Sequence, residues 1–187
     1  VQERDDAFTR CTALNLVDAF GWDHATKIQY WLEAVMKEGY EGRKPDVAAV
    51  YYDGSNGSNI YSYDGSMDDY EFLEHHLLRT PYLIRDKPKV LVIGVGGGID
   101  MFNAIKQGAR HVTGVELQPK TVYVLKELIR DFTGGFYDRD DVTLLAGEGR
   151  HFVRKTDEIY DMVQITAVDT FAAQTTGAYV LAESYLY

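Results

Sequence analysis

From Lys89 onward, short apolar runs alternate with segments whose apolar residues recur at helical spacing. The runs "VLVIG" and "YDMVQI" are apolar almost throughout, which is typical of strands buried on both faces of a parallel sheet. Strands and helices that alternate in this way form right-handed crossovers and an α/β fold. The pattern predicts strands at 90–94, 111–116, 142–146 and 160–165, separated by helices at 99–107, 119–131 and 149–154.

The preceding part of the chain carries a different pattern. After Pro45, two runs rich in aromatic and β-branched residues flank a Gly/Asn/Ser turn, "DVAAVYYDGSNGSNIYSYDGS", which predicts a small β-hairpin. Residues 68–84, "DDYEFLEHHLLRTPYLI", open with a capping aspartate and predict a helix. We therefore expect a helical and β-hairpin region at 1–80 and a ligand-binding core at 81–187.

The predicted sheet of the core stops after its fourth strand, because the sequence ends within the helix that should follow. An apolar strand at the open edge of a sheet is an association hazard. We therefore expect that the sheet is truncated after the fourth strand, or that a second copy covers the edge and forms a homodimer.

Composition narrows the classes of partner. The chain carries 19 Lys and Arg against 29 Asp and Glu, a net charge of −10, which repels nucleic acid and anionic lipid. No apolar run approaches the roughly 18 residues of a membrane-spanning helix, so we expect no direct membrane contact. The single cysteine, Cys11, excludes an internal disulfide and fits a reducing cytoplasmic setting. The charged start "VQERDDAFTR" does not resemble a secretion signal and indicates a trimmed fragment.

The first candidate ligand site is the glycine-rich stretch "KVLVIGVGGGID" at the end of the first core strand. In a parallel sheet the ligand lies beyond the carboxyl ends of the strands, and glycines let it approach the main chain closely. The spacing differs from the dinucleotide fingerprint because Ile99 stands where a third glycine is needed. A purely structural turn is the alternative. The glycines concerned are Gly94, Gly96, Gly97 and Gly98.

Carboxylates follow the other strands. Glu116 ends the second strand, 22 residues after Gly94, where it can accept hydrogen bonds from both hydroxyls of a ribose. Glu148, before a short helix, can accept from the amine of an adenine, although a simple helix cap would have the same sequence. Leu117 and Gly149, the residues next to these two carboxylates, complete the set that we assign to the nucleoside.

Two aspartates are candidates for the reacting end of the site. Asp169 follows the fourth strand and is the best candidate for a catalytic group that anchors a cationic acceptor, with a helix cap as the alternative. Asp100, just past the glycines, either holds the cationic end of a donor or complements the helix dipole. Tyr179 and Glu183 lie on the next predicted helix and are candidates for contact with the substrate.

Five stretches together resemble the spermidine synthase family, the polyamine aminopropyltransferases with a methyltransferase-like, Rossmann-type fold. They are "KVLVIGVGGGID", "VTGVELQPKTV", "LLAGEGRHFV", "YDMVQITAVDT" and the hairpin with "EFLEHHLLRTPYL", and the likeness covers about residues 46–187. More narrowly, the chain is similar to bacterial spermidine-synthase-like domains of unassigned substrate, some of which are fused to membrane segments. The resemblance implies that Glu116 matches the ribose-binding acidic residue and Glu148 the adenine-binding aspartate. Glu71 and His75 fall near a Glu and a His of the family.

The chain departs from the family pattern on the acceptor side. The glycine loop of the family carries an aspartate where this chain has Gly97, and the first of two aspartates after the fourth strand is here Thr166. A threonine hydroxyl cannot take a proton from an ammonium near neutral pH, so ordinary putrescine aminopropylation is in doubt. Asp169 retains the second position.

Three classes of function follow. The first is an aminopropyltransferase-like enzyme that uses decarboxylated S-adenosylmethionine and an altered, cationic amine acceptor. The second is a methyltransferase that uses S-adenosylmethionine, since Gly97 removes a charge that would repel the methionine carboxylate. The third is a nucleoside-binding domain without catalysis. We expect no metal, because His75 and His76 are adjacent and so point to different faces of a helix.

Overall fold

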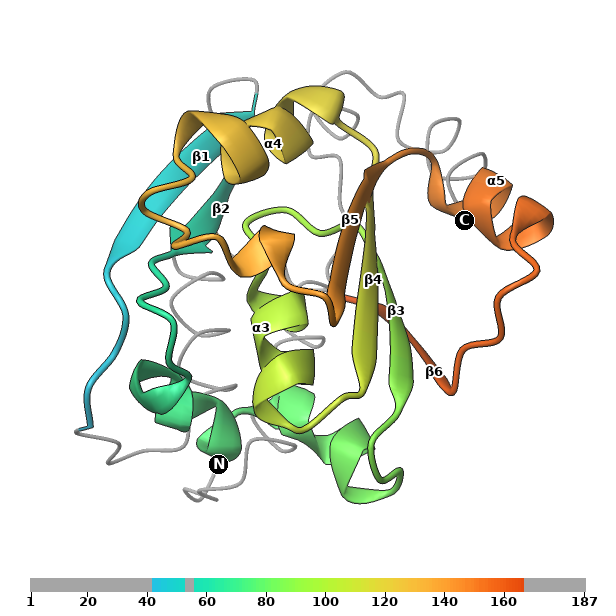
Figure 1. The fold of residues 1–187 in the computed structure, drawn as a ribbon, viewed down its shortest axis with the longest axis horizontal. Helices are drawn as coiled ribbons and strands as arrows, with labels where there is room; N and C mark the ends of the chain where they lie inside the picture. The colour runs from blue at the N-terminus through green and yellow to red at the C-terminus, as the bar shows by residue number, and fades with distance from the viewer. Residues whose placement is uncertain (1–41, 53–55, 167–187) are drawn as a thin grey trace, which may run out of the picture.

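The structure is a computed structural model that describes residues 42–52 and 56–166, and Figure 1 shows its ribbon. Cys11, Asp169, Tyr179 and Glu183 lie outside the described residues. In chain order, the elements are β1 (Val47–Tyr52), β2 (Asn56–Tyr61), the 3₁₀ segments η1 (Asp68–His75) and η2 (Leu77–Leu83), β3 (Lys89–Ile93), α3 (Ile99–Lys106), β4 (His111–Glu116), α4 (Pro119–Tyr123), the π-helical segment η3 (Val124–Leu128), the 3₁₀ segment η4 (Phe136–Asp138), β5 (Val142–Ala146), α5 (Gly149–Lys155) and β6 (Met162–Ile165).

A parallel four-stranded sheet forms the centre of the described fold, in the order β5-β4-β3-β6. β3 is central: Val92 pairs with Gly114 of β4 on one side and with Gln164 of β6 on the other. The chain therefore proceeds from β3 to β4 and β5 in one direction and then crosses back to β6. This reversal is the topological switch point of a Rossmann-type sheet, and it lies between β3 and β6.

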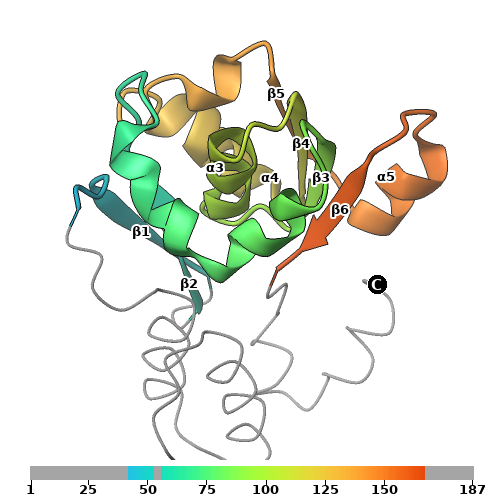
Figure 2. The same ribbon diagram turned by 90° about the horizontal axis from the view of Figure 1, so that it is seen from below.

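Helices cover both faces of the sheet. α3, α4 and the hairpin lie on one side and α5 lies on the other, as the two views in Figures 1 and 2 show. With right-handed βαβ crossovers, the helices that link β3, β4 and β5 lie on one face, and the helix before the crossing back to β6 lies on the other. One hydrophobic core joins side chains of the three strands to those of α3: Val90, Val92, Val112, Val142 and Leu144 with Met101, Phe102 and Ala104.

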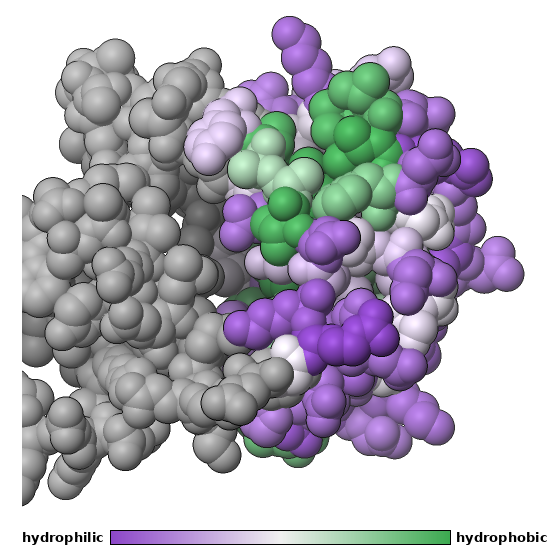
Figure 3. Space-filling model, turned by 90° about the vertical axis from the view of Figure 1, so that its left-hand side faces the viewer, coloured by the Kyte–Doolittle hydropathy of each residue, from purple (hydrophilic) through white to green (hydrophobic). Residues whose placement is uncertain are grey.

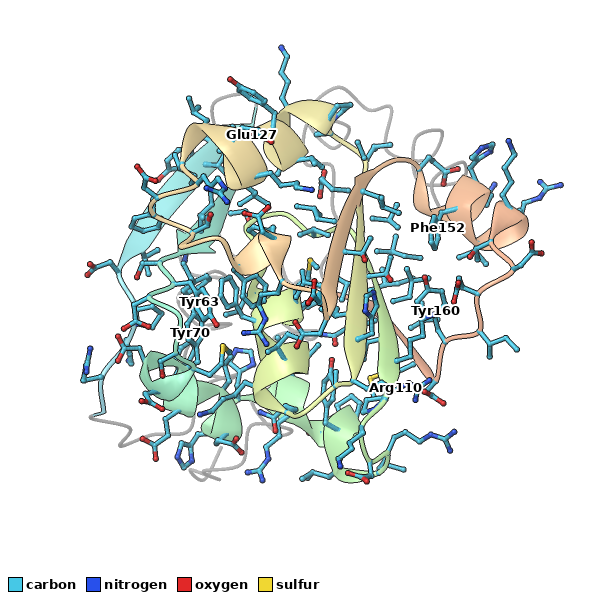
Figure 4. The ribbon with its side chains drawn as sticks, in the orientation of Figure 1. Tyr63, Tyr70, Arg110, Glu127, Phe152 and Tyr160 are labelled. Carbon is cyan, nitrogen blue, oxygen red and sulfur yellow. The ribbon has the colours of Figure 1, made fainter. Side chains whose placement is uncertain are left out.

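The hairpin is the antiparallel pair that the sequence predicts, with Val47 opposite Tyr61. Aromatic rings tie the segment that follows it to α3: the Tyr70 ring stacks on Phe102 at a centroid distance of 4.6 Å, and Phe102 stacks on Phe136 at 3.8 Å. Tyr63 meets Phe136 edge to face at 5.4 Å. Tyr63 and Tyr70 are labelled beside α3 in Figure 4. The buried rings make the hairpin region and the sheet region share one core.

Two predicted helices differ from the structure in geometry. Residues 68–84 form two 3₁₀ segments instead of one helix, because His76 between them is extended and its Nδ1 accepts a hydrogen bond from the Leu78 N–H. Pro81 within the second segment lacks the N–H that an α-helix would use. The helix expected at 119–131 ends sooner, since residues 124–128 widen into a π-helical turn.

Apolar side chains also reach the surface at several places, two of which are described next. Figure 3 views the side that carries β1 and the α4–η3 helix, where apolar side chains gather; Val47, Tyr123 and Leu128 of these elements are exposed. On β6, the edge strand of the described sheet, Val163 and Ile165 are exposed. Within the described ranges, no helix is long and apolar enough to cross a membrane.

Candidate functional site

The glycine stretch forms a tight loop between β3 and α3 at the carboxyl edge of the sheet. Gly98 caps α3 in a left-handed conformation with φ of 96°, and Gly96 has φ of 53°. Side chains other than glycine rarely adopt these angles, so the loop depends on glycine for its backbone path. Atoms of Ser58, Asn59 and Tyr137 occupy the space that Cβ atoms at positions 96 to 98 would fill, so the glycines have a structural role here and the approach of a ligand to this backbone stays a prediction.

Glu116 ends β4 beside this loop, as the sequence predicts. One carboxylate oxygen accepts a hydrogen bond from the Gly96 N–H at 2.9 Å, and the other accepts from the Gln118 N–H at 2.9 Å. The side chain is 6% exposed. A carboxylate offers about four lone-pair positions, and these two N–H groups use two of them. The two backbone contacts hold the carboxylate and the loop in a fixed relation before any ligand binds.

The hairpin packs directly on the glycine loop, which the sequence did not predict. The Ser58 hydroxyl accepts a hydrogen bond from the Gly97 N–H at 2.7 Å. A Cβ atom on Gly97 would collide with the backbone carbonyl of Asn59. The close approach of β2 therefore explains why this position has no side chain, and an aspartate here would require the hairpin to move.

Glu148 lies at the amino end of α5, where both of its oxygens accept hydrogen bonds from backbone N–H groups. The donors are Arg150 at 2.7 Å and His151 at 2.8 Å. Glu148 is thus a helix cap, the alternative that the sequence left open, and a role in adenine binding stays a prediction. Next to it, Gly149 is buried against Ile93, while Leu117 is exposed after β4.

A polar cluster occupies the other side of the loop, where the end of β6 meets the start of α3. Asp100, in the first turn of α3, is 4% exposed, and its Oδ1 is buried without a hydrogen-bond partner. Burial raises the pKa of Asp100 to about 6, although the nearby polar side chains of Thr166 and Gln164 act in the opposite direction. Asp100 therefore lies at the switch point between β3 and β6.

Tyr82 and Gln164 belong to this cluster and were not among the residues predicted from the sequence. The Tyr82 hydroxyl donates to Gln164 Oε1 at 2.9 Å, and Gln164 Nε2 donates to Thr166 Oγ1 at 3.3 Å. Burial raises the pKa of Tyr82, with the Asp100 charge adding to the effect, so that the phenol stays protonated and donates. The glutamine among the apolar residues of "MVQI" is the signal that could have identified Gln164.

The structure does not bring Glu71 and His75 to the glycine loop. Both side chains are exposed on η1. η1 packs beside the carboxyl end of α3, where Gln107 Nε2 donates to the Leu73 carbonyl oxygen. α3 has 8 residues and is thus about 12 Å long, which separates this end from the loop.

A hollow of about 540 Å³ lies between the sheet and α5. Phe152 and Tyr160 extend into this space in Figure 4, and Arg110 lies at its lower edge. Lys89 and His111, which begin β3 and β4, also line it, so it extends toward the amino ends of the strands, away from the glycine loop. Among residues 42–52 and 56–166, no group of three or more His, Cys, Asp or Glu side chains could hold a metal ion.

Comparisons with known proteins agree with the resemblance seen in the sequence. The family model described as spermine/spermidine synthase domain matches residues 71–183, which is more than half of the chain. A polyamine aminopropyltransferase of Korarchaeum cryptofilum is 31% identical over 103 residues, which cover 54% of this chain and 32% of the relative. Polyamine aminopropyltransferase 2 of Pseudomonas aeruginosa is 29% identical over 136 residues, which cover 70% of this chain and 39% of the relative.

Among solved structures, spermidine synthase from Thermotoga maritima is 21% identical, with a TM-score of 0.43, covering 71% of this chain and 60% of that one. The chain spans between 32% and 39% of the length of the two curated relatives above. The match of the family model, over the segment that contains the glycine loop, Glu116 and the switch point, identifies the chain as a member of the spermine/spermidine synthase family.

Proposed function

We propose that the chain binds an adenosyl sulfonium, S-adenosylmethionine or its decarboxylated form, and transfers an alkyl group from it to an amine. The observation that carries the proposal is Glu116, a buried carboxylate fixed beside the glycine loop, whose remaining lone pairs would accept from the hydroxyls of a ribose. Membership of the family and the names of the curated relatives support the same class of reaction.

The transfer requires an acceptor amine in its neutral form. A neutral amine attacks the carbon next to the sulfonium, the carbon–sulfur bond breaks, and the sulfur leaves as a neutral thioether. The new secondary ammonium then loses a proton. An amine with a pKa near 10 is mostly protonated at neutral pH, so a carboxylate must hold the cation and help to remove its proton.

The described residues support part of the predicted donor site. We retain the glycine loop and Glu116 as the residues that bind the nucleoside. Glu148, Leu117 and Gly149 stay assigned to the same ligand. Asp169 and Tyr179 stay proposals because they lie outside the described residues. Glu71 and His75 are not included, because η1 packs at the far end of α3 from the loop.

Methyl transfer is the second candidate, and the contact between Gly97 and Asn59 favours it. The loop has no acidic side chain at this position, and the Asn59 carbonyl leaves no room for one. A methionine carboxylate would therefore meet no negative charge at Gly97. The two forms of transfer differ in which donor the loop accepts.

Titration calorimetry on the 187-residue chain tests the proposal. Methylthioadenosine, S-adenosylmethionine and decarboxylated S-adenosylmethionine are titrated into the wild type, Glu116→Gln and Glu127→Gln. Glu127 is exposed on η3, at the top of Figure 4, and serves as the matched control. Hydrogen bonds to a charged group contribute about 1.5–3 kcal/mol, so we expect Glu116→Gln to bind all three about 10- to 100-fold more weakly.

The preferred donor decides the type of transfer. Tighter binding of the decarboxylated donor supports aminopropyl transfer, and tighter binding of S-adenosylmethionine supports methyl transfer. If none of the three binds to the wild type, the proposal fails. Thermal unfolding without ligand separates a change in binding from a change in the fold of Glu116→Gln.

We also propose that a second copy of the chain covers β6. The exposed Val163 and Ile165 on this edge strand support a homodimer. Light scattering at micromolar concentration should give twice the chain mass of 21.2 kDa, and a stable monomer would contradict the dimer.

A further inference from the structure

The two faces of the sheet differ in the amino half of its strands. Toward α3, the side chains of Val90, Val112 and Val142 are buried in the core. Parallel strands that are buried on both faces are usually apolar on both. Here, however, the neighbouring residues that face α5 are polar and line the hollow described above: Lys89, His111, Thr113 and Thr143. This polar face therefore needs an explanation other than packing of the sheet.

A simple wet edge of the sheet does not account for all of these groups. Thr113 is only 4% exposed, and its hydroxyl has no hydrogen-bond partner within the ranges that the structure describes. Buried polar groups nearly always have a partner. Beside it, His111 Nε2 and Thr143 Oγ1 lie 3.1 Å apart, at hydrogen-bond distance. Because Thr113 lines the hollow, a molecule held there is the natural partner for its hydroxyl.

Positive charge gathers at one end of the hollow, in a chain whose net charge is −10. Lys89 and Arg110 both line it. Arg110 uses only Nη1, which pairs with Asp161 Oδ2 at 2.7 Å and donates to the Lys87 carbonyl oxygen at 3.3 Å. Nε and Nη2 of this guanidinium are therefore available to a further acceptor. A guanidinium suits a planar or tetrahedral oxyanion, because it can donate two parallel hydrogen bonds.

Lys89 is held by an ion pair that an incoming anion can replace. Its Nζ contacts the Glu158 carboxylate and lies 5.2 Å from the centre of the Tyr160 ring. The Lys89 side chain is 20% exposed, whereas that of Glu158 is 62% exposed. Ion pairs with an exposed partner contribute little to stability, so Glu158 can turn into the solvent while Lys89 stays in place. A ligand anion would then occupy the position of the Glu158 carboxylate.

The wall formed by α5 and the segment after it is aromatic. The rings of Phe152 and Tyr160 lie 6.4 Å apart at an angle of 54°, and both extend into the hollow in Figure 4. Leu145 of β5 lines the hollow from the sheet and is 39% exposed. The volume of about 540 Å³ is within the usual range of small-molecule sites, which combine apolar walls with a few polar groups.

We propose that this hollow binds a small aromatic oxyanion, a carboxylate or phosphate carried on a flat ring. The charged group would meet Lys89 and Arg110 and accept from the Thr113 hydroxyl, while the ring would lie against Phe152 and Tyr160. An inorganic anion would leave the aromatic wall uncovered, and a neutral aromatic molecule would leave the cations without a new partner. The site thus selects for both parts in one molecule.

This site is separate from the one proposed for the donor. His111 begins β4 and lines the hollow, whereas Glu116 ends the same strand beside the glycine loop. Five residues of strand separate them, which is about 16 Å at 3.3 Å per residue. The inference therefore does not depend on the proposed transferase function.

Titrations followed by ¹H–¹⁵N NMR on the 187-residue chain test the proposal. The probes are 1-naphthyl phosphate and 1-naphthoate, with inorganic phosphate as the anion alone and 1-naphthol as the uncharged ring. We expect at least one aromatic anion to bind with a dissociation constant below about 1 mM and to shift the amide signals of Thr113 and Thr143. Phosphate and 1-naphthol should bind about 10-fold more weakly. The tighter of the two anions identifies the charged group as phosphate or carboxylate.

Two variants with opposite effects separate binding at the hollow from a change in the fold. Glu158→Gln frees Lys89 and should bind the aromatic anion about 3- to 5-fold more tightly, while Asp157→Asn, an exposed neighbour outside the lining, should not change the affinity. Lys89→Gln should bind about 10-fold more weakly, with Lys120→Gln on α4 as its matched control. Thermal unfolding shows whether Lys89→Gln keeps its fold, and an increase in affinity cannot come from unfolding.

Several results would overturn the inference. One is the absence of binding by either aromatic anion up to about 5 mM, and another is equal binding of 1-naphthol. An unchanged or lower affinity of Glu158→Gln would show that Lys89 does not receive the anion. Glu116→Gln should bind the probes as the wild type does, and a loss there would place them at the nucleoside site instead of the hollow.

Discussion

Replacing Asp100 with asparagine should stabilise the protein at neutral and alkaline pH. The pKa of Asp100 is raised by burial from 3.8 to about 6, which means that the folded chain binds this proton more tightly than the unfolded chain does. Below pH 4 the carboxyl group is largely neutral in the folded state and costs little. As the pH rises through 6, the group ionises in a site that withholds solvent, and stability is lost.

The size of the effect follows from the shift in pKa. A shift of about 2 units at roughly 1.4 kcal/mol per unit corresponds to about 3 kcal/mol once the group is fully ionised. Part of this cost is already present at pH 4, so the difference should grow by about 2–3 kcal/mol between pH 4 and pH 8. Asparagine has the same shape and can still pair with Thr166, but it carries no charge.

Urea unfolding of the wild type, Asp100→Asn and Asp157→Asn at pH 4, 6 and 8 measures the free energies needed. We expect the advantage of Asp100→Asn over the wild type to widen with pH, while Asp157→Asn, an exposed site, keeps a constant offset. A constant offset for Asp100→Asn, or a loss of stability that grows toward pH 8, would refute the reasoning. It would mean that the protein itself compensates the Asp100 charge.

Three further predictions concern the frame around the site. Gly97→Ala should destabilise the fold by about 1–3 kcal/mol in urea unfolding, because its Cβ would overlap the Asn59 carbonyl. Gly147→Ala, where a Cβ meets only ordinary van der Waals contact, is the control, and equal effects would argue against the tight packing. Phe102→Ala should cost about 3–5 kcal/mol, since the ring is fully buried between two others; a loss under about 1 kcal/mol would contradict that packing. Asp161→Asn should lower the melting temperature at pH 7 but not at pH 2. Hydrogen bonds from the backbone of Lys89 and from arginine side chains lower the pKa of Asp161 to about 2, so the stabilising charge is lost in acid. An equal loss at both pH values would count against this.

The periodicity of the sequence was sufficient for the sheet and the hairpin. The apolar run of β3 and the alternation that follows it predicted four parallel strands, and the position of Glu116 at the end of the second strand placed it correctly beside the glycines. These features depend on local pattern and on the general geometry of parallel sheets. They need no knowledge of which side chains meet.

The contacts that define the reacting side could not be predicted in this way. Tyr82 and Gln164 are 82 positions apart, and Ser58 and Gly97 are 39 apart. No periodicity links such pairs, because they meet through the path of the whole chain. Helix geometry was missed for a local reason: the extended His76 and Pro81 divide a segment whose apolar spacing still suits one helix.

The packing of β2 on the glycine loop couples two positions that are distant in the sequence. Asn59 places its carbonyl where any side chain at position 97 would begin, so neither segment is free to change alone. A relative that carries an aspartate in this loop should therefore also carry a hairpin of different length or path. The hairpin and the loop would then vary together across the family, as a matched pair that determines which charges the donor meets.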